Sequence, residues 1–215
     1  MLTQDQILMN KQEFIGLIES IKRNGADIAK LVNKLQHSDF FYAPASTKYH
    51  AAYEGGLCEH SLNVYHQLKR LVNTIPGLDP YCYDEDSLKI ISLLHDISKM
   101  NIYEKTSKNV KVYCDEVDAQ KRDEMGWFKW VSEPGWKTKD KKFAYGSHEM
   151  NSEYIIRQFI PLTIDESVAV LHHMGGMNYD SAQDNLAEIY TQYQLSMLLH
   201  FADMLATYID ERDDT

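Results

Sequence analysis

Five histidines and two aspartates of this 215-residue chain lie in apolar stretches of helical periodicity, where polar side chains need partners. An ionised aspartate in such a stretch is costly unless a cation pairs with it, and a divalent metal ion is a sufficient partner. Imidazole and carboxylate groups together suit manganese, iron, nickel, zinc or magnesium. The sequence therefore predicts a metal site with these candidate ligands: His60, His95, Asp96, His148, His172, His173 and Asp203.

The number of ions, one or two, is left open by the sequence. A histidine taken alone is usually a surface residue or a satisfied core residue, and His37, His50, His66 and His200 are interpreted in that way. The absence of a thiolate cluster excludes a structural zinc finger. Asp96 has two carboxylate oxygens and could bridge two ions. Two metals roughly 3.5–4 Å apart would generate a hydroxide and stabilise the attacking and leaving oxygens of a phosphate ester.

Helices must position most of these residues. Apolar side chains recur at helical spacing near residues 7–21, 28–35, 56–73, 86–97, 147–160, 164–174 and 188–209. The segment from about Met100 to Gly146 breaks this rhythm, because Asn109 to Cys114 alternates like a strand and Pro134-Gly135 is typical of a turn. The predicted fold class is all-α, a helical bundle with a small inserted β-like hairpin or flap. The acidic end from Asp210 is expected to fray.

The composition is that of a globular protein, with 44% hydrophobic residues and a formal net charge of -10. This charge argues against binding of long nucleic acids, which depends on Lys and Arg. Small phosphorylated ligands stay possible because bound metals reverse the local field. The cysteines Cys58, Cys82 and Cys114 form no CxxC pair, and the chain shows neither a signal peptide nor a membrane span. A soluble protein of the cytoplasm is expected.

The ordered set of a His, a His-Asp pair, a His, a His-His pair and an Asp resembles the HD superfamily of metal-dependent phosphohydrolases. The closest similarity is to the HD domain of bacterial 3′–5′ exoribonucleases. It rests on APASTKYHAAYEGGLCEHSLNV, SLLHDISKM, VLHHMGG and LLHFADMLA. The resemblance implies an HD-domain helical bundle over residues 26–210, with a poorly matched insertion at about 100–146. An N-terminal helix (1–25) would precede it and an acidic tail (211–215) would follow.

This resemblance also implies roles for individual residues. One metal would be held by His60, His95, Asp96 and Asp203, and a second by His148, His172 and His173 with Asp96 bridging. Asp96 and Lys99 would be the catalytic residues. Lys99 matches a lysine that contacts the substrate phosphate, although the preceding Ser98 departs from the usual glycine. The alternative for Lys99 is a solvated cation at a helix end.

Two glycines are further candidates for substrate binding. The amides of Gly55 and Gly56 could donate to a phosphate at the start of a helix. A plain turn leading into the helix is the alternative for both residues.

The function expected from this pattern is hydrolysis of a phosphomonoester or phosphodiester of a nucleotide or short oligonucleotide by a metal-bound hydroxide. The alternatives are a di-iron HD-fold oxygenase and a non-catalytic, metal-stabilised nucleotide-binding or regulatory module. The exoribonucleases carry a separate nucleic-acid-binding module that these 215 residues do not resemble. Trp127, Trp130 and Trp136 could stack a base or form a small core under the hairpin. The exact substrate, the native metal and the oligomeric state stay open.

Overall fold

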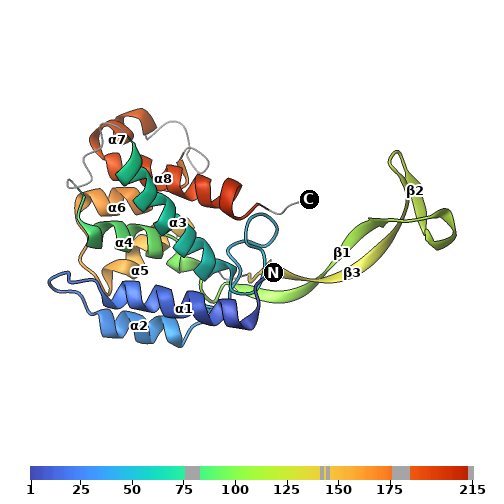
Figure 1. Ribbon diagram of the computed structural model, residues 1–215, viewed down its shortest axis with the longest axis horizontal. Coiled ribbons are helices and arrows are strands. Elements are labelled where there is room, and N and C mark those ends of the chain that lie inside the picture. Colours follow the sequence, from blue (N-terminus) through green and yellow to red (C-terminus); the bar gives the residue numbers. More distant parts are fainter. Residues whose placement is uncertain (76–82, 141–142, 144–145, 176–184, 213–215) are drawn as a thin grey trace.

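A helical body and a projecting β-sheet arm make up the computed structural model, which describes residues 1–75, 83–140, 143, 146–175 and 185–212 (Figure 1). The predicted mainly helical class is confirmed, with a three-stranded antiparallel sheet added to it. Within the described residues, eight α-helices form the body: α1 (Gln4–Glu19), α2 (Ile28–Gln36), α3 (Gly56–Thr74), α4 (Glu85–Leu94), α5 (His148–Arg157), α6 (Ile164–Leu171), α7 (Leu186–Gln192) and α8 (Gln194–Leu205).

Side chains just before the helices fix where several of them begin. Thr3 and Thr163 each form a capping box with the residue three positions later, at the starts of α1 and α6. Asp27, Asp84 and Asn185 accept a backbone N–H at the starts of α2, α4 and α7. These caps satisfy amides that a helix leaves unpaired, so the helix starts are set by local chemistry.

One hydrophobic core joins the helices of the body. Helix α3 packs against α1, α4 and α8, and α8 also packs against α6. Phe14, Phe40 and Phe41 are fully buried and contact one another edge-on or tilted. Burying each such ring stabilises the fold by roughly 1.5–3 kcal/mol. The helices that carry the candidate ligands are therefore held in one rigid unit.

The predicted β-like insertion is confirmed as an arm of three strands in the order β1-β3-β2. Strand β1 (Tyr103–Tyr113) pairs with β3 (Gly126–Thr138) along its whole length, whereas β2 (Lys121–Asp123) pairs only with the first residues of β3. The arm extends away from the body as a twisted ribbon (Figure 1). At its base, the Tyr103 hydroxyl donates to the backbone carbonyl of Ala45.

The turn predicted at Pro134-Gly135 is wrong, because both residues lie inside β3. Pro134 is opposite Ser107 and Gly135 is opposite Thr106. Strand β3 has a single neighbour at this point, so a residue without an N–H can occupy it. A Cβ on Gly135 would lie 2.7 Å from the side chain of Lys108, which donates to the backbone carbonyl of Thr47. The glycine therefore gives this lysine room to cross the strand.

The C-terminal segment also differs from the expected single helix over 188–209. Tyr193 separates α7 from α8, and a π-helical turn, Ala206–Asp210, follows α8. The expected fraying from Asp210 is wrong for the first two residues, since Asp210 accepts from Gln67 and the side chain of Glu211 is buried. Residues 213–215 of the predicted tail, and Cys82, lie outside the described residues.

The described part of the chain contains no helix of sufficient length and apolarity to cross a membrane.

Candidate metal centre

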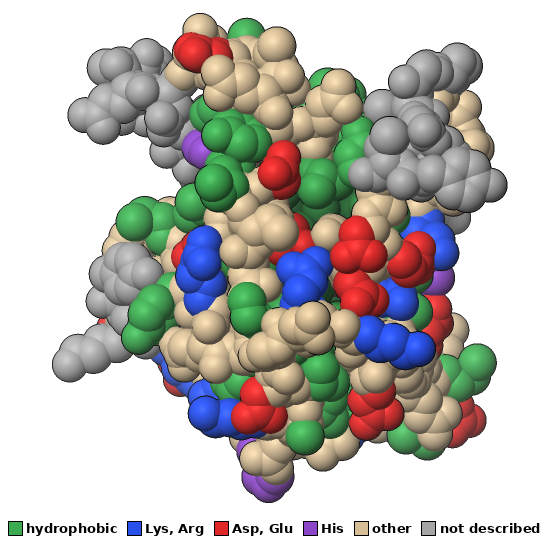
Figure 2. Space-filling model, turned by 90° about the vertical axis from the view of Figure 1, so that its left-hand side faces the viewer, with side chains coloured by type: hydrophobic (Ala, Val, Ile, Leu, Met, Phe, Trp, Pro, Cys, Tyr) green, Lys and Arg blue, Asp and Glu red, His purple; other side chains and the backbone are tan. Residues whose placement is uncertain are grey.

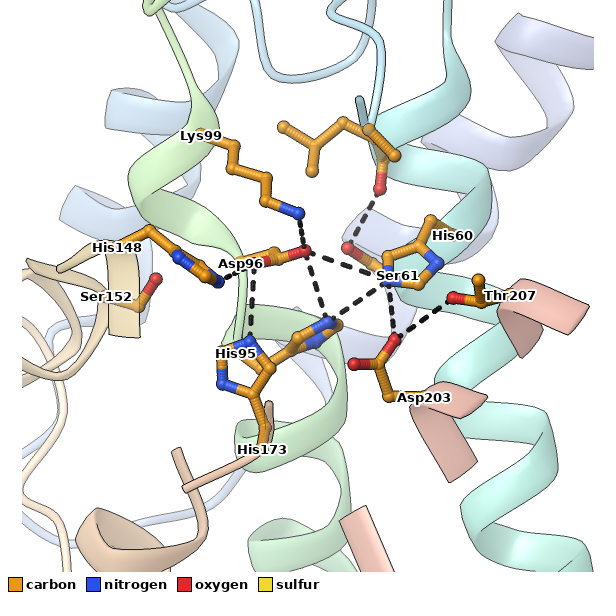
Figure 3. A network of polar contacts seen from close by, with 12 residues as sticks. His60, Ser61, His95, Asp96, Lys99, His148, Ser152, His173, Asp203 and Thr207 are labelled. Atoms are coloured by element: carbon orange, nitrogen blue, oxygen red, sulfur yellow. Dashed lines mark hydrogen bonds and ion pairs between the residues drawn. The ribbon is translucent and has the colours of Figure 1, made fainter. Parts of the chain in front are cut away.

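The structure brings six of the seven predicted ligands to one place between α3, α5 and α8 (Figure 3). Helices α3 and α8 supply His60 and Asp203 from within their length. The other four residues lie at helix ends, where His148 opens α5 and the remainder follow α4 or α6. These four are His95, Asp96, His148 and His173.

The two doublets do not lie inside helices as predicted, because α4 ends at Leu94 and α6 ends at Leu171. Apolar residues continue past the end of α4 into a 3-10 turn, Ile97–Lys99, so periodicity does not reveal where the helix stops. The position has a chemical consequence, since a residue beyond a helix end can reach carbonyls that the helix leaves unpaired.

His95 and His173 use such carbonyls in the same way. The Nδ1 of His95 lies 2.7 Å from the carbonyl oxygen of Ser92, and that of His173 lies 2.7 Å from the carbonyl oxygen of Val170. A carbonyl only accepts, so Nδ1 must carry the proton in both rings. When neutral, each ring therefore presents the lone pair of Nε2 to the centre, which is the form that binds a metal.

Asp96 lies at the middle of the cluster, with its two oxygens facing different residues (Figure 3). Oδ1 is 3.6 Å from Nε2 of His148 and 3.6 Å from Nε2 of His173. Oδ2 is 3.4 Å from Nε2 of His95 and 3.7 Å from Nε2 of His60. On the far side, Oδ1 of Asp203 lies 3.2 Å from Nε2 of His60.

Three buried polar atoms of this cluster have no hydrogen-bond partner among the described residues: Asp96 Oδ1, His148 Nε2 and His173 Nε2. Each such atom costs about 1–3 kcal/mol if nothing binds it. The ligand atoms of His60, His95 and Asp203 lie within 4.8 Å of one another, as do those of His95, Asp96 and His173. These buried groups could therefore hold a metal ion.

The charges of the cluster balance one another. Burial opposes ionisation of Asp96, but the Lys99 ammonium and the neighbouring imidazoles hold its pKa well below the usual range. Burial likewise opposes ionisation of Asp203, whose pKa is lowered by His60. Burial lowers the pKa of His148 to about 4, which keeps this imidazole neutral and able to act as a ligand.

Carboxylates face both nitrogens of His60, Asp203 at Nε2 and Glu211 at Nδ1. Burial lowers the pKa of His60, but the negative charges of Glu211 and Asp203 outweigh burial and raise the pKa to about 10. A metal ion at Nε2 must displace a proton, as metal binding to histidine generally does.

Lys99 is not a solvated cation at a helix end, because its side chain is only 13% exposed and its ammonium lies 2.6 Å from Oδ2 of Asp96. Burial lowers the pKa of Lys99, but the charge of Asp96 outweighs it and raises the pKa to about 12. The side chain therefore keeps a positive charge beside the candidate ligands.

Gly55 and Gly56 have steric reasons for being glycine. Gly55 has a φ of 85°, and a Cβ on Gly56 would lie 2.1 Å from the carbonyl oxygen of Ala51. Their amides already donate to the carbonyls of Tyr42 and Tyr53. This geometry favours the turn at the start of α3 over phosphate binding by these amides.

One predicted ligand, His172, is not among the six residues of the cluster, and the sequence did not indicate two residues that lie close to His60. Within the described residues, neither His148 nor His172 belongs to a group whose ligand atoms all lie within 4.8 Å of one another, but Nε2 of His148 lies 3.6 Å from Oδ1 of Asp96. The role of His172 as a ligand stays a prediction. His50 and Glu211 do approach His60. No periodicity or motif pointed to Glu211, which follows the last helix in an acidic run.

A cavity of about 650 Å³ opens above the cluster. Asp96, Lys99 and Asp203 form its polar floor, and the side chains of Met174 and Met204 contribute to its wall. Tyr49 and Tyr208 also line it. A cavity of this size accommodates a ligand of nucleotide dimensions.

Comparison with protein-family models, curated proteins and solved structures finds no significant match to this chain. Its function must be inferred from the chemistry of its own residues.

Proposed function

We propose that this protein is a metal-dependent phosphohydrolase that cleaves a phosphate ester of a nucleotide or short oligonucleotide. The observation that carries the proposal is the set of buried atoms without a hydrogen bond on Asp96, His148 and His173, beside the ammonium of Lys99. A ligand set of imidazole and carboxylate suits a divalent transition metal, and a largely buried lysine suits a phosphate. The resemblance of the sequence to HD phosphohydrolases is consistent with this chemistry. The site could hold one or two metal ions.

A divalent metal bound by these residues would activate water and neutralise negative charge on a phosphate. Lys99 lines the cavity with an ammonium that Asp96 orients and keeps protonated. A phosphate oxygen that enters the cavity would accept a hydrogen bond from this ammonium. The developing negative charge on that phosphate is then met by a fixed cation, which lowers the barrier without reorganisation.

The walls of the cavity suit a nucleoside group attached to that phosphate. Tyr49 and Tyr208 are exposed at the cavity, where their rings could stack on a base. Met174 and Met204 add adaptable apolar contacts. On the face of the body opposite the arm, acidic and basic side chains lie next to one another (Figure 2). Together with the net charge of -10, this disfavours a long polyanion as substrate.

A panel of nucleotides, cyclic dinucleotides and short RNAs, assayed with manganese, tests the proposal. We expect the wild-type protein to release phosphate or nucleoside, and Asp96→Ala to lose about 100-fold or more of that rate. Glu104→Gln, which removes only an exposed ion pair with Lys137 at the base of the arm, is the matched control and should retain the rate. Equal release by wild type and Asp96→Ala would show that the activity does not belong to this centre.

The same assay separates the alternatives. Nucleotide binding without release of any product would favour a non-catalytic binding module. Oxygen consumption by the iron-loaded protein, without hydrolysis, would favour the oxygenase.

A further inference from the structure

The buried carboxylate of Glu211 contacts the candidate ligand His60 at Nδ1. Its Oε1 and Oε2 lie 2.9 Å and 3.2 Å from Nδ1 of His60. The side-chain amide of Asn63 donates to Oε1 at 3.0 Å, so the carboxylate is itself held in place. Only about 1% of the Glu211 side chain is exposed. A carboxylate this deeply buried is expensive to desolvate, and the paired imidazole accounts for its position.

His60 therefore lies between two carboxylates from the same end of the chain. Asp203 faces Nε2, on the side of the metal cluster, and Glu211 faces Nδ1, on the opposite side. The ring is fully buried and can neither flip nor rotate without losing both contacts. The Nδ1 proton is directed to Glu211, and Nε2 is directed to the cluster.

A π-helical turn accounts for the placement of these two carboxylates. In a regular α-helix, residues eight positions apart differ in direction by about 80° around the axis. Between Asp203 and Glu211, however, the chain forms the π turn Ala206–Asp210, and the amide of Glu211 donates to the carbonyl of Ala206. A wider turn rotates less per residue, which brings Glu211 round toward the direction of Asp203. Such turns are frequent at functional sites.

We propose that Glu211 is a positioning residue for the metal ligand His60. Its carboxylate accepts the Nδ1 proton, fixes the tautomer with a free Nε2 and increases the electron density that Nε2 offers to a metal ion. The inference rests on the metal centre proposed above. It is independent of the substrate and of the reaction.

The adjacent Asp210 supplies the control for a merely structural role. Its carboxylate accepts from the side-chain amide of Gln67 at 2.8 and 3.0 Å, which ties the same turn to α3 without contacting His60. If Glu211 served only to hold the end of the chain on α3, then loss of Asp210 would have the same consequence.

Titration of the purified variants with Co²⁺ tests the proposal, with calorimetry for affinity and visible absorption for the geometry of the bound ion. We expect Glu211→Ala to bind Co²⁺ about 10- to 100-fold more weakly than wild type and to alter the absorption bands. Glu211→Gln keeps an oxygen that can accept from Nδ1, so its loss should be smaller, about tenfold or less. Asp210→Ala removes the contact with Gln67 and should bind like wild type, with an unchanged spectrum.

Two results would overturn the inference while leaving the metal centre intact. One is wild-type affinity and an unchanged spectrum in both Glu211 variants. The other is an equal loss of affinity in Asp210→Ala and Glu211→Ala. Failure of the wild-type protein to bind Co²⁺ would instead overturn the metal centre and the inference with it. If Glu211→Ala does not fold, the nearly isosteric Glu211→Gln, which should fold, decides the matter through the same two readouts.

Discussion

The helical body and the β-sheet arm differ in how many large apolar side chains they bury. The body encloses a continuous hydrophobic core and holds all the candidate metal ligands that the structure brings together. In the arm beyond Tyr103, Phe128 is the one buried large apolar side chain of residues 104–138. A two-stranded ribbon is at best marginally stable by itself. The arm can therefore open locally while the body, and with it the site, stays folded.

Charge is divided between the two regions as well. Residues 103–139 contain eight Lys and Arg and seven Asp and Glu, whereas the whole chain contains 22 and 32. The arm therefore carries a formal net charge of +1 and the rest of the chain one of -11. A negative body attracts divalent cations toward the centre, because the summed charge of a protein raises the local concentration of counterions.

Replacing one buried phenylalanine in each region is the strongest test of this comparison. Phe14→Ala removes a fully buried ring from the core of the body and should lower the free energy of unfolding by about 3–5 kcal/mol. Phe128→Ala removes a ring of the same size from the arm. It should lower the global value by less than about 1 kcal/mol, since opening of the arm does not require unfolding of the body. Denaturant unfolding followed by helical circular dichroism measures both, and equal losses would contradict the comparison.

One ion pair in each region provides a second matched test, with the next largest expected effect on the free energy of unfolding. In the body, Glu166 is fully buried and accepts from Arg23 at 2.6 and 3.0 Å and from Ser87 at 2.6 Å. Breaking a buried pair is strongly destabilising, so Glu166→Gln should lower the free energy of unfolding by about 3 kcal/mol. In the arm, Glu104 pairs with Lys137 at an exposed position, and Glu104→Gln should have no measurable effect.

The effect of Glu166→Gln should also depend on pH. Burial opposes ionisation of Glu166, but its bonds to Arg23 and Ser87 outweigh burial and lower its pKa from the ordinary value of 4.5. A group with a lowered folded pKa stabilises the protein above its unfolded pKa and loses that contribution as pH falls through the folded value. The difference between wild type and Glu166→Gln should therefore be full at about pH 7 and shrink below about pH 4.5. A difference that grows in acid would contradict this assignment.

Truncation of the arm should have the smallest effect on the site. Thr106 and Gly135 lie opposite each other, so a two-residue Asn-Gly turn can replace residues 107–134. The truncation keeps Tyr103, which contacts Ala45, and Trp136, which packs against the core. We expect the Co²⁺ affinity of the truncated protein to lie within about threefold of wild type, because no ligand comes from the arm. A larger loss in the same calorimetric titration would show that the arm supports the centre.

Much of the body could be predicted from the sequence because its signals are local. Periodicity located α2 and α3 closely and the start of α4, and the loss of periodicity after Met100 located the arm. Pro134-Gly135 misled because the same dipeptide suits a turn and a strand with one free edge. The break at Tyr193 was missed because the apolar pattern continues across it.

The types of metal ligand could be predicted from local sequence signals alone. Imidazole and carboxylate groups in apolar stretches need a partner wherever they lie, so His60, Asp96 and Asp203 could be proposed without a structure. Which of these groups come together, and through which atoms, depends on the tertiary structure. It placed the two doublets beyond helix ends, where carbonyls fix the ring tautomers, and it paired Lys99 with Asp96. It also placed Glu211, which belongs to the acidic run at the end of the chain, beside His60. Contacts between residues 151 positions apart depend on packing, and no local pattern encodes them.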